Sequence, residues 1–286
     1  MYPYDLLPTV DFLDVRLYGI MIALGLLACF FVLFFFGKKK GYSDNYLDFI
    51  FYTAIVSIVL GFLSAALFQA FYNYLDNPQG GFRLGGGITF IGGLIGGATT
   101  FLTIYFLFRK KLSVSIYDFM NFAPPCILIA HAFGRVGCLF AGCCHGEYLG
   151  ANPVFGGLFM KGESGWGYYV PTQLYEALFL FILFGVTLFL TMKKDFKHNL
   201  SLYISSYGLF RFIIEFFRAD DARGQFIGSL SPSQFWSILM IVAGIGLVFF
   251  VEFVVKKKKQ KQALEKVEEQ LDTQSDKAEQ IDPPTE

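Results

Sequence analysis

The sequence predicts an all-α integral membrane protein with seven transmembrane helices, its N-terminus outside, its C-terminus in the cytoplasm and a small outer cap. Three observations lead to this prediction. First, 55% of the 286 residues are hydrophobic and only 16% are charged, whereas a soluble domain usually has about a quarter charged residues. Second, seven apolar stretches have about the 20 residues that a helix needs to cross the bilayer core. Third, the clusters of basic residues that follow alternate stretches would all face one side of the membrane.

The predicted spans fill most of residues 1–255, which we interpret as one transmembrane domain. Residues 256–286 are polar, charged and without aromatics, and this composition is typical of a disordered segment. We therefore predict a cytoplasmic tail that is disordered after a short helix. The predicted spans are residues 17–36, 47–71, 88–108, 117–142, 172–192, 200–218 and 233–255.

The orientation follows from the positive-inside rule, which assigns loops rich in lysine and arginine to the cytoplasm. Basic clusters follow the first, third, fifth and seventh spans, at 38–40, 109–111, 193–197 and 256–259. An odd number of spans then places the N-terminus outside. The longest outer segment, 143–171, is rich in glycine and aromatic residues, and we predict that it forms the ordered cap.

Charged residues near the outer ends of the predicted spans are the first candidates for a site, because charge at membrane depth is costly and usually functional. Arg135 has no acidic residue within a turn of its own helix, so it either binds a phosphate, onto which a guanidinium forks, or snorkels to the interface. Arg211 and Glu215 are four residues apart and share a helix face. They form either a self-neutralising pair or a site in which Glu215 holds Arg211 for an anionic ligand, and the nearest anion is a phospholipid headgroup.

Other polar or small residues have two interpretations as well. The run from Gly92 to Gly97 contains two overlapping G-x-x-x-G spacings, which favour close helix packing and also leave room for a headgroup. Gln173, Tyr175 and Glu176 fall at the outer start of the fifth span. Helix-start polarity accounts for Glu176, and the other two are either site residues or interface anchors.

Three of the five cysteines, Cys138, Cys143 and Cys144, lie close together in the sequence beside His145. The spacing is not that of a standard zinc site, so no metal is expected. A disulfide from Cys138 to either neighbour is an open alternative on the oxidising side of the membrane. A membrane thiol-redox protein that uses these three cysteines is therefore one alternative function.

Six short motifs follow one another along the predicted spans. They are RLYGIMIALG with Tyr18, GGITFIGGLIGG with Gly92 and Gly93, GRVGCLFAGCCHGE with Arg135, PTQLYEA with Gln173 and Tyr175, YGLFRFIIEFFRAD with Arg211, Glu215 and Arg218, and SPSQFWSI. Together they resemble the motifs of the prolipoprotein diacylglyceryl transferase family. This resemblance covers most of the spans and includes the arrangement with the N-terminus outside.

The resemblance implies an enzyme of the bacterial cytoplasmic (inner) membrane that acts at the outer leaflet. Such an enzyme moves the diacylglyceryl group of phosphatidylglycerol to the thiol of the lipobox cysteine in a prolipoprotein signal peptide. A thioether forms and glycerol phosphate leaves. No cofactor and no nucleic acid are expected.

The resemblance also implies roles for individual residues. Ile91 stands where the best-known family form has histidine. The base that takes the proton of the acceptor thiol is therefore unassigned. Either His145 or Glu147 supplies it, or the positive field of the arginines and water suffice. Ile91 also motivates a second alternative function, a phospholipid-binding relative without transferase activity. The expected catalytic residues are Arg211, Glu215 and Tyr18, and the expected substrate-binding residues are Arg135, Gln173, Tyr175, Arg218, Gly92 and Gly93.

Overall fold

The computed structural model describes residues 17–85, 87, 89–108, 116–162, 165–193, 196–218 and 230–281. The chain divides into two compact units at Ala141 and Gly142. The described part of the first unit holds helices α1 (Leu17–Lys39), α2 (Asp44–Asp76), η1 (Pro78–Gly80), α3 (Phe90–Phe108) and α4 (Ile116–Phe140). The second holds β1 (Tyr148–Gly150), β2 (Leu158–Gly162), β3 (Gly165–Tyr169), α5 (Thr172–Met192), α6 (Asn199–Ile214), η3 (Glu215–Phe217) and α7 (Pro232–Ile281).

Six of the described helices are long and apolar enough to cross a membrane. They are α1, α2, α4, α5, α6 together with η3, and the first part of α7. The sequence predicts a seventh span at 88–108, and the structure forms α3 there, with a described apolar part, Gly92–Phe108, that is shorter than the others. The multi-pass character is thus confirmed, while the count of seven spans stays a prediction.

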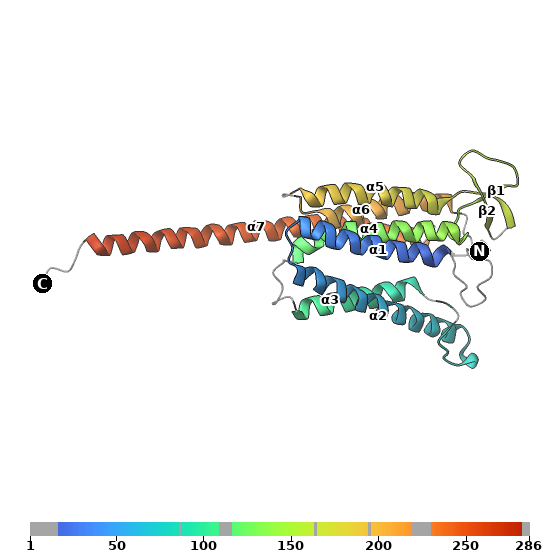
Figure 1. Ribbon diagram of the computed structural model, residues 1–286, viewed down its shortest axis with the longest axis horizontal. Coiled ribbons are helices and arrows are strands. Elements are labelled where there is room, and N and C mark those ends of the chain that lie inside the picture. The colour runs from blue at the N-terminus through green and yellow to red at the C-terminus, as the bar shows by residue number, and fades with distance from the viewer. Residues whose placement is uncertain are drawn as a thin grey trace. The chain divides into compact units, whose positions relative to one another are not determined.

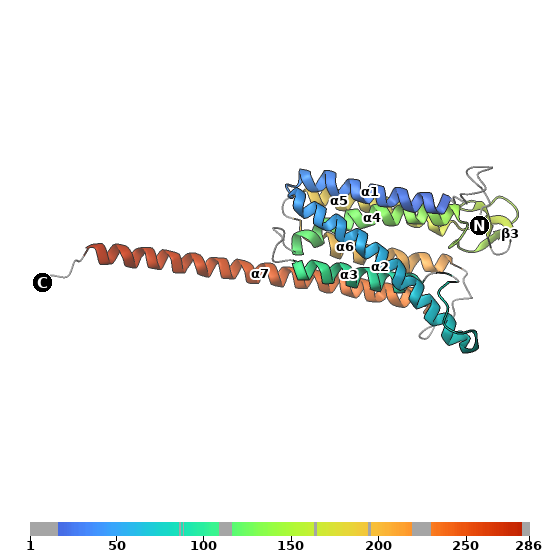
Figure 2. The same ribbon diagram turned by 60° about the horizontal axis from the view of Figure 1, so that its bottom comes forward.

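In the first unit, α1 packs beside α4 and α2 packs beside α3 (Figures 1 and 2). Glycines allow both approaches. A Cβ added to Gly25 would lie 2.9 Å from Phe133 Cβ, and one added to Gly61 would lie 3.1 Å from the Gly93 carbonyl oxygen. Small residues at such contacts let helix backbones come close in a membrane, where association depends on packing.

In the second unit, α6 packs against α7, and a Cβ on Gly208 would lie 3.0 Å from the Ser237 carbonyl oxygen. The rings of Phe179 and Phe210 stack between α5 and α6 with centroids 4.2 Å apart. Segment 143–171, predicted to form an ordered cap, contains an antiparallel three-stranded sheet in the order β1-β3-β2. The all-α prediction therefore omitted this sheet, whose short strands carry aromatic residues that favour extended backbone.

Helix α7 is 50 residues long and continues as a single helix to Ile281 (Figure 1). The sequence predicts a helix that ends soon after residue 256, and the structure continues it without interruption. The predicted disorder of the tail stays a prediction.

Candidate functional site

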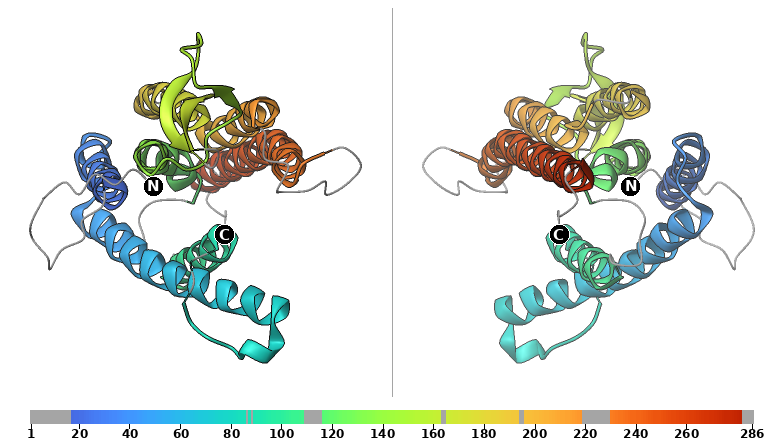
Figure 3. Two further views of the ribbon diagram at one scale, coloured as in Figure 1. Left: turned by 90° about the vertical axis from the view of Figure 1, so that its right-hand side faces the viewer. Right: turned by 90° about the vertical axis from the view of Figure 1, so that its left-hand side faces the viewer.

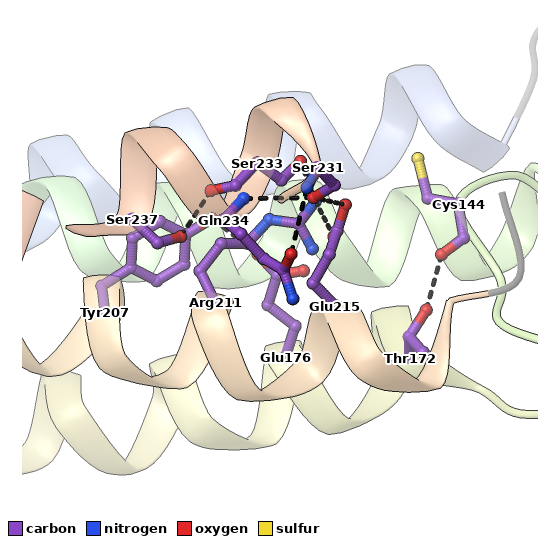
Figure 4. A network of polar contacts seen from close by, with 10 residues as sticks. All are labelled: Cys144, Thr172, Glu176, Tyr207, Arg211, Glu215, Ser231, Ser233, Gln234 and Ser237. Atoms are coloured by element: carbon purple, nitrogen blue, oxygen red, sulfur yellow. Dashed lines mark hydrogen bonds and ion pairs between the residues drawn. The ribbon is translucent and has the colours of Figure 1, made fainter. Parts of the chain in front are cut away.

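The second unit contains a buried polar network around Arg211 and Glu215 (Figure 4). Arg211 lies in the last turn of α6, and Glu215 begins η3 one turn later. Arg211 Nη2 lies 2.9 Å from Glu215 Oε2, and the two side chains are only 12% and 6% exposed. The shared helix face expected from their spacing is therefore confirmed, and the pair is almost fully enclosed.

The start of α7 supplies hydroxyl groups to both members of this pair. Ser231 Oγ donates to Glu215 Oε1 at 3.0 Å, and Arg211 Nη2 donates to Ser233 Oγ at 3.0 Å. The sequence Ser-Pro-Ser-Gln fixes this geometry through a reciprocal capping box. The Gln234 amide N–H donates to Ser231 Oγ at 3.2 Å, and the Ser231 amide N–H donates to Gln234 Oε1 at 3.0 Å. Pro232 at the first helical position has no N–H that would need a partner.

Helix α5 adds a second carboxylate to the network. Glu176 is 1% exposed, and Tyr207 donates its hydroxyl to Glu176 Oε1 at 2.7 Å. Tyr207 precedes Arg211 by four residues on α6, so both side chains leave the same helix face. Figure 4 shows Glu176 beside Arg211 and Glu215. Three helices thus place one guanidinium between acidic, phenolic and hydroxyl groups.

Arg211 has unused hydrogen-bonding capacity in this network. A guanidinium offers five N–H donors in a fixed fork. Nη1 of Arg211 is buried and has no hydrogen-bond partner among the described residues. Buried donors in native proteins are nearly always satisfied, so Nη1 is a candidate donor to a water molecule or to an oxygen of a ligand.

The other three predicted residues of this unit have different surroundings. Gln173 is 0% exposed, with Nε2 3.7 Å from Met160 Sδ beneath the sheet and Oε1 buried without a hydrogen-bond partner in the described part of the chain. Tyr175 donates its hydroxyl to the Gly156 carbonyl oxygen at 2.8 Å. Arg218 ends η3, with its amide N–H donating to the Glu215 carbonyl oxygen at 3.1 Å. Their predicted roles in substrate binding stay predictions.

The remaining predicted residues lie in the first unit. Tyr18 begins α1 and is 42% exposed, and its ring packs on Gly137 of α4, where an added Cβ would be 3.1 Å from Tyr18 Cδ2. The first-span motif and the arginine signature therefore meet at one end of α1 and α4. Arg135 lies in α4 and is partly buried.

The two glycines of the third-span motif lie in the contact between α2 and α3. A Cβ on Gly92 would be 2.6 Å from Phe68 Cβ, and a Cβ on Gly93 would be 3.3 Å from Ala65 Cβ. These contacts agree with helix packing as the reason for glycine here. Their role in substrate binding stays a prediction, and the Ile91 side chain lies outside the described residues.

The loop that follows the arginine signature is tied to α5 and η3. Thr172 Oγ1 donates to the Cys144 carbonyl oxygen at 2.7 Å, and the Glu147 amide N–H donates to the Phe217 carbonyl oxygen at 3.2 Å. The His145 ring packs on Tyr169 with centroids 4.4 Å apart, whereas Glu147 is exposed. The structure describes all five cysteines of the chain, and none is in a disulfide.

Sequence reasoning missed part of the network. Helix-start polarity accounts for Glu176. Tyr207 appears only as part of YGLFRFIIEFFRAD, and Ser231 and Ser233 appear only as part of SPSQFWSI. The four-residue spacing of Tyr207 and Arg211 and the Ser-x-x-Gln pattern were the available signals. Neither pattern predicts that α5, α6 and α7 pack together around Arg211.

Comparison with known proteins agrees with the motifs. The family model of prolipoprotein diacylglyceryl transferase matches residues 6–250. A phosphatidylglycerol–prolipoprotein diacylglyceryl transferase of Clostridium tetani is 37% identical over 234 residues, which cover 80% of this chain and 90% of the relative. The enzyme of the same name from Dehalococcoides mccartyi is 34% identical over 261 residues, covering 89% and 94%. Phosphatidylglycerol–prolipoprotein diacylglyceryl transferase 2 of Clostridium perfringens is 31% identical over 242 residues, covering 82% and 90%. The protein therefore belongs to the prolipoprotein diacylglyceryl transferase family.

Proposed function

We propose that this protein transfers the diacylglyceryl group of phosphatidylglycerol to the thiol of a lipobox cysteine in prolipoproteins. The family membership and the names of the relatives support this activity. The single structural observation that carries it is the buried Arg211 guanidinium, which is held by Glu215 and Ser233 and has one Nη without a partner among the residues that the structure describes. Such a group suits a phosphate, because its planar fork matches phosphate oxygens.

The reaction sets two tasks for the protein. The acceptor thiol has to lose its proton, because the thiolate is the nucleophile. Its sulfur then forms a bond to the glyceryl carbon while the bond from that carbon to the phosphate oxygen breaks, so glycerol phosphate leaves with the electron pair. Fixed positive charge near the departing oxygen stabilises this step, because it is already in place when the negative charge develops.

The residues divide between these tasks. In our proposal Arg135 binds the headgroup phosphate of phosphatidylglycerol and Tyr18 hydrogen-bonds to the headgroup. Arg211 stabilises the departing phosphate, and Glu215 orients Arg211 through the 2.9 Å ion pair. For the proton of the thiol we favour Glu147, since it is exposed while the His145 ring is packed against Tyr169.

The placement in the membrane is part of the proposal. Seven spans, with α3 as the third, put the N-terminus outside and the C-terminus in the cytoplasm of a bacterial inner membrane. The lysine-rich segments at 38–40 and 256–259 then face the cytoplasm, as the positive-inside rule requires. The reaction takes place at the outer leaflet, where the lipobox peptide arrives.

The proposal is tested with purified protein in detergent, phosphatidylglycerol and a lipobox peptide. Mass spectrometry should show the mass of the diacylglyceryl group on the peptide cysteine, and Arg135→Ala should abolish this gain without unfolding the protein. Bound phosphatidylglycerol without any mass gain would instead identify a phospholipid-binding relative. Normal turnover by Arg135→Ala would refute the assigned role of this arginine.

The thiol-redox alternative is tested in the same assay. The acceptor thiol of the proposed reaction belongs to the substrate, so Cys143→Ser and Cys144→Ser should keep most of the transfer activity. The Sγ atoms of Cys138, Cys143 and Cys144 lie within 4.8 Å of one another, so this alternative needs a test of its own. Loss of transfer in both variants, together with a redox-sensitive disulfide in the native chain, would reverse this assignment.

A further inference from the structure

One face of α5 carries a continuous row of exposed apolar side chains. Leu178, Ile182, Val186 and Phe189 are 53%, 68%, 44% and 62% exposed. Their spacings of four, four and three residues place them on one face of the helix. The opposite face is buried and includes Glu176. Because α5 is a candidate membrane span, the exposed row is its lipid-facing side.

Tyr175 continues this row by one more turn toward the N-terminal end of α5. Its hydroxyl donates to the Gly156 carbonyl oxygen at 2.8 Å, in the coil of residues 151–157 that joins β1 and β2. Gly156 has a φ of +82°, which a residue with a side chain rarely adopts. The preceding residue, Phe155, is 104% exposed, the largest exposure among the exposed large hydrophobic residues. The hydrogen bond therefore holds Phe155 close to the end of the lipid-facing row.

Phe155 belongs to an exposed group that we call the aromatic rim, which consists of Phe155, Phe159 and Trp166. The rings of Phe159 and Trp166 stack with centroids 5.7 Å apart, and their side chains are 50% and 48% exposed. Met160 follows Phe159 on β2 and therefore faces the other side of the sheet, where it is buried. The alternation of strand residues thus turns aromatic side chains outward. Figures 1 and 3 show the coil of the rim projecting away from the helices of its unit.

We propose that the aromatic rim inserts into the interfacial layer of the bilayer, among phospholipid headgroups and the upper acyl chains, beside the N-terminal end of α5. At about 1.5 Å per residue, the 21 residues of α5 span about the 30 Å of a hydrocarbon core. Thr172 then lies at the border of the core, and only Val170 and Pro171 separate it from the sheet. Tryptophan and tyrosine concentrate at this level of a membrane. A large exposed apolar patch marks a site that contacts a membrane or another protein, and its place beside the lipid-facing row of α5 favours the membrane. Exposed Lys161, opposite Trp166 in the sheet, adds attraction to anionic headgroups.

The insertion is measured with a single tryptophan. The chain has two, Trp166 and Trp236, so Trp166→Phe with Trp236→Phe gives a background that keeps aromatic rings at both positions. Phe155→Trp in this background is reconstituted into vesicles of phosphatidylglycerol and phosphatidylcholine with bromine on the acyl chains, either near the ester or near the chain end. Ile182→Trp is the reference for the bilayer core, and Gln79→Trp, in an exposed turn, is the reference for water.

Bromine near the ester should quench Phe155→Trp most strongly, with emission blue-shifted from that of Gln79→Trp, and bromine near the chain end should quench Ile182→Trp most strongly. Tyr175→Phe should reduce the bromine quenching at position 155 and leave that at 182 unchanged, which a general loss of structure would not do. Quenching at 155 by aqueous acrylamide and not by bromine would overturn the proposal. Shielding that begins only when a lipobox peptide is added would also overturn it and would assign the rim to the peptide. The transferase assay on the same Phe155→Trp protein is independent, so either proposal can fail without the other.

Discussion

At the scale of single residues, the environment of Arg211 determines what each substitution in the network should do. Its guanidinium makes two defined contacts, to Glu215 Oε2 and Ser233 Oγ, and its Nη1 has no partner among the described residues. A lysine keeps the charge at this position but not the fork. The contacts to Glu215, Ser233 and phosphate therefore cannot all survive the exchange.

Arg211→Lys should lower the transfer rate by about 10²- to 10³-fold, the cost of losing a donor that stabilises developing negative charge. The measurement is the initial rate of diacylglyceryl addition to a lipobox peptide, followed by mass spectrometry. Arg83→Lys, on an exposed arginine in the loop after η1, is the matched control and should keep the native rate. Equal rates for the two variants would contradict the role of Arg211.

Ser233→Ala should also slow transfer, because it removes the hydroxyl that receives the Arg211 Nη2 hydrogen bond. Hydrogen bonds to charged groups contribute about 1.5–3 kcal/mol, so a loss of about tenfold or more in rate is expected. Ser237→Ala is the control one turn later, since the Ser237 hydroxyl donates to the Ser233 carbonyl oxygen of its own helix at 2.7 Å. If Ser237→Ala were as slow as Ser233→Ala, the effect would come from the helix and not from Arg211.

Glu147→Gln tests the proposed base. The amide cannot take the proton of the thiol, so transfer at neutral pH should fall and should recover partly as the pH rises toward the thiol pKa of about 8.5. His145→Gln should leave the dependence of the transfer rate on pH unchanged. In our proposal the His145 ring has a packing role against Tyr169 and does not take the proton. A rate for Glu147→Gln that is native at every pH would remove it from the mechanism.

At the scale of elements, the close pairing of α2 with α3 depends on glycines that the sequence singles out. A Cβ on Gly96 would overlap the Ser64 side chain. By contrast, a Cβ on Gly185 of α5 meets nothing within 4 Å. The same substitution should therefore have opposite effects at the two positions.

Gly96→Ala should destabilise the protein by about 1–3 kcal/mol through overpacking, whereas Gly185→Ala should be neutral or stabilise it by about 0.5–1 kcal/mol. Unfolding in mixed detergent micelles, followed by circular dichroism, gives both values. Ser64→Gly should restore part of the stability lost in Gly96→Ala. Destabilisation of both single variants alike would mean that glycine itself, and not the contact, matters at these positions.

At the scale of the whole molecule, the proposed orientation is tested by labelling. In a cysteine-free background, Asn77→Cys after α2 and Lys256→Cys in α7 lie at exposed positions. An impermeant maleimide should label Asn77→Cys on intact cells and Lys256→Cys only after permeabilisation. The reverse pattern would invert the topology.

The sequence by itself determined the membrane class, the family and most helix positions, because these depend on composition, span length and local motifs that each segment carries alone. The four-residue spacing of Arg211 and Glu215 likewise sufficed to predict a shared helix face. The tertiary structure decided what sequence spacing cannot express. It brought Glu176, Tyr207 and Ser233 to Arg211 from three helices, because each helix buries its polar face against the others. It enclosed Gln173 beneath Met160, packed Gly92 against Phe68, and formed a sheet in the cap. Contacts between segments far apart in the chain arise from packing and from the need to satisfy buried polar groups, and no single segment encodes either requirement.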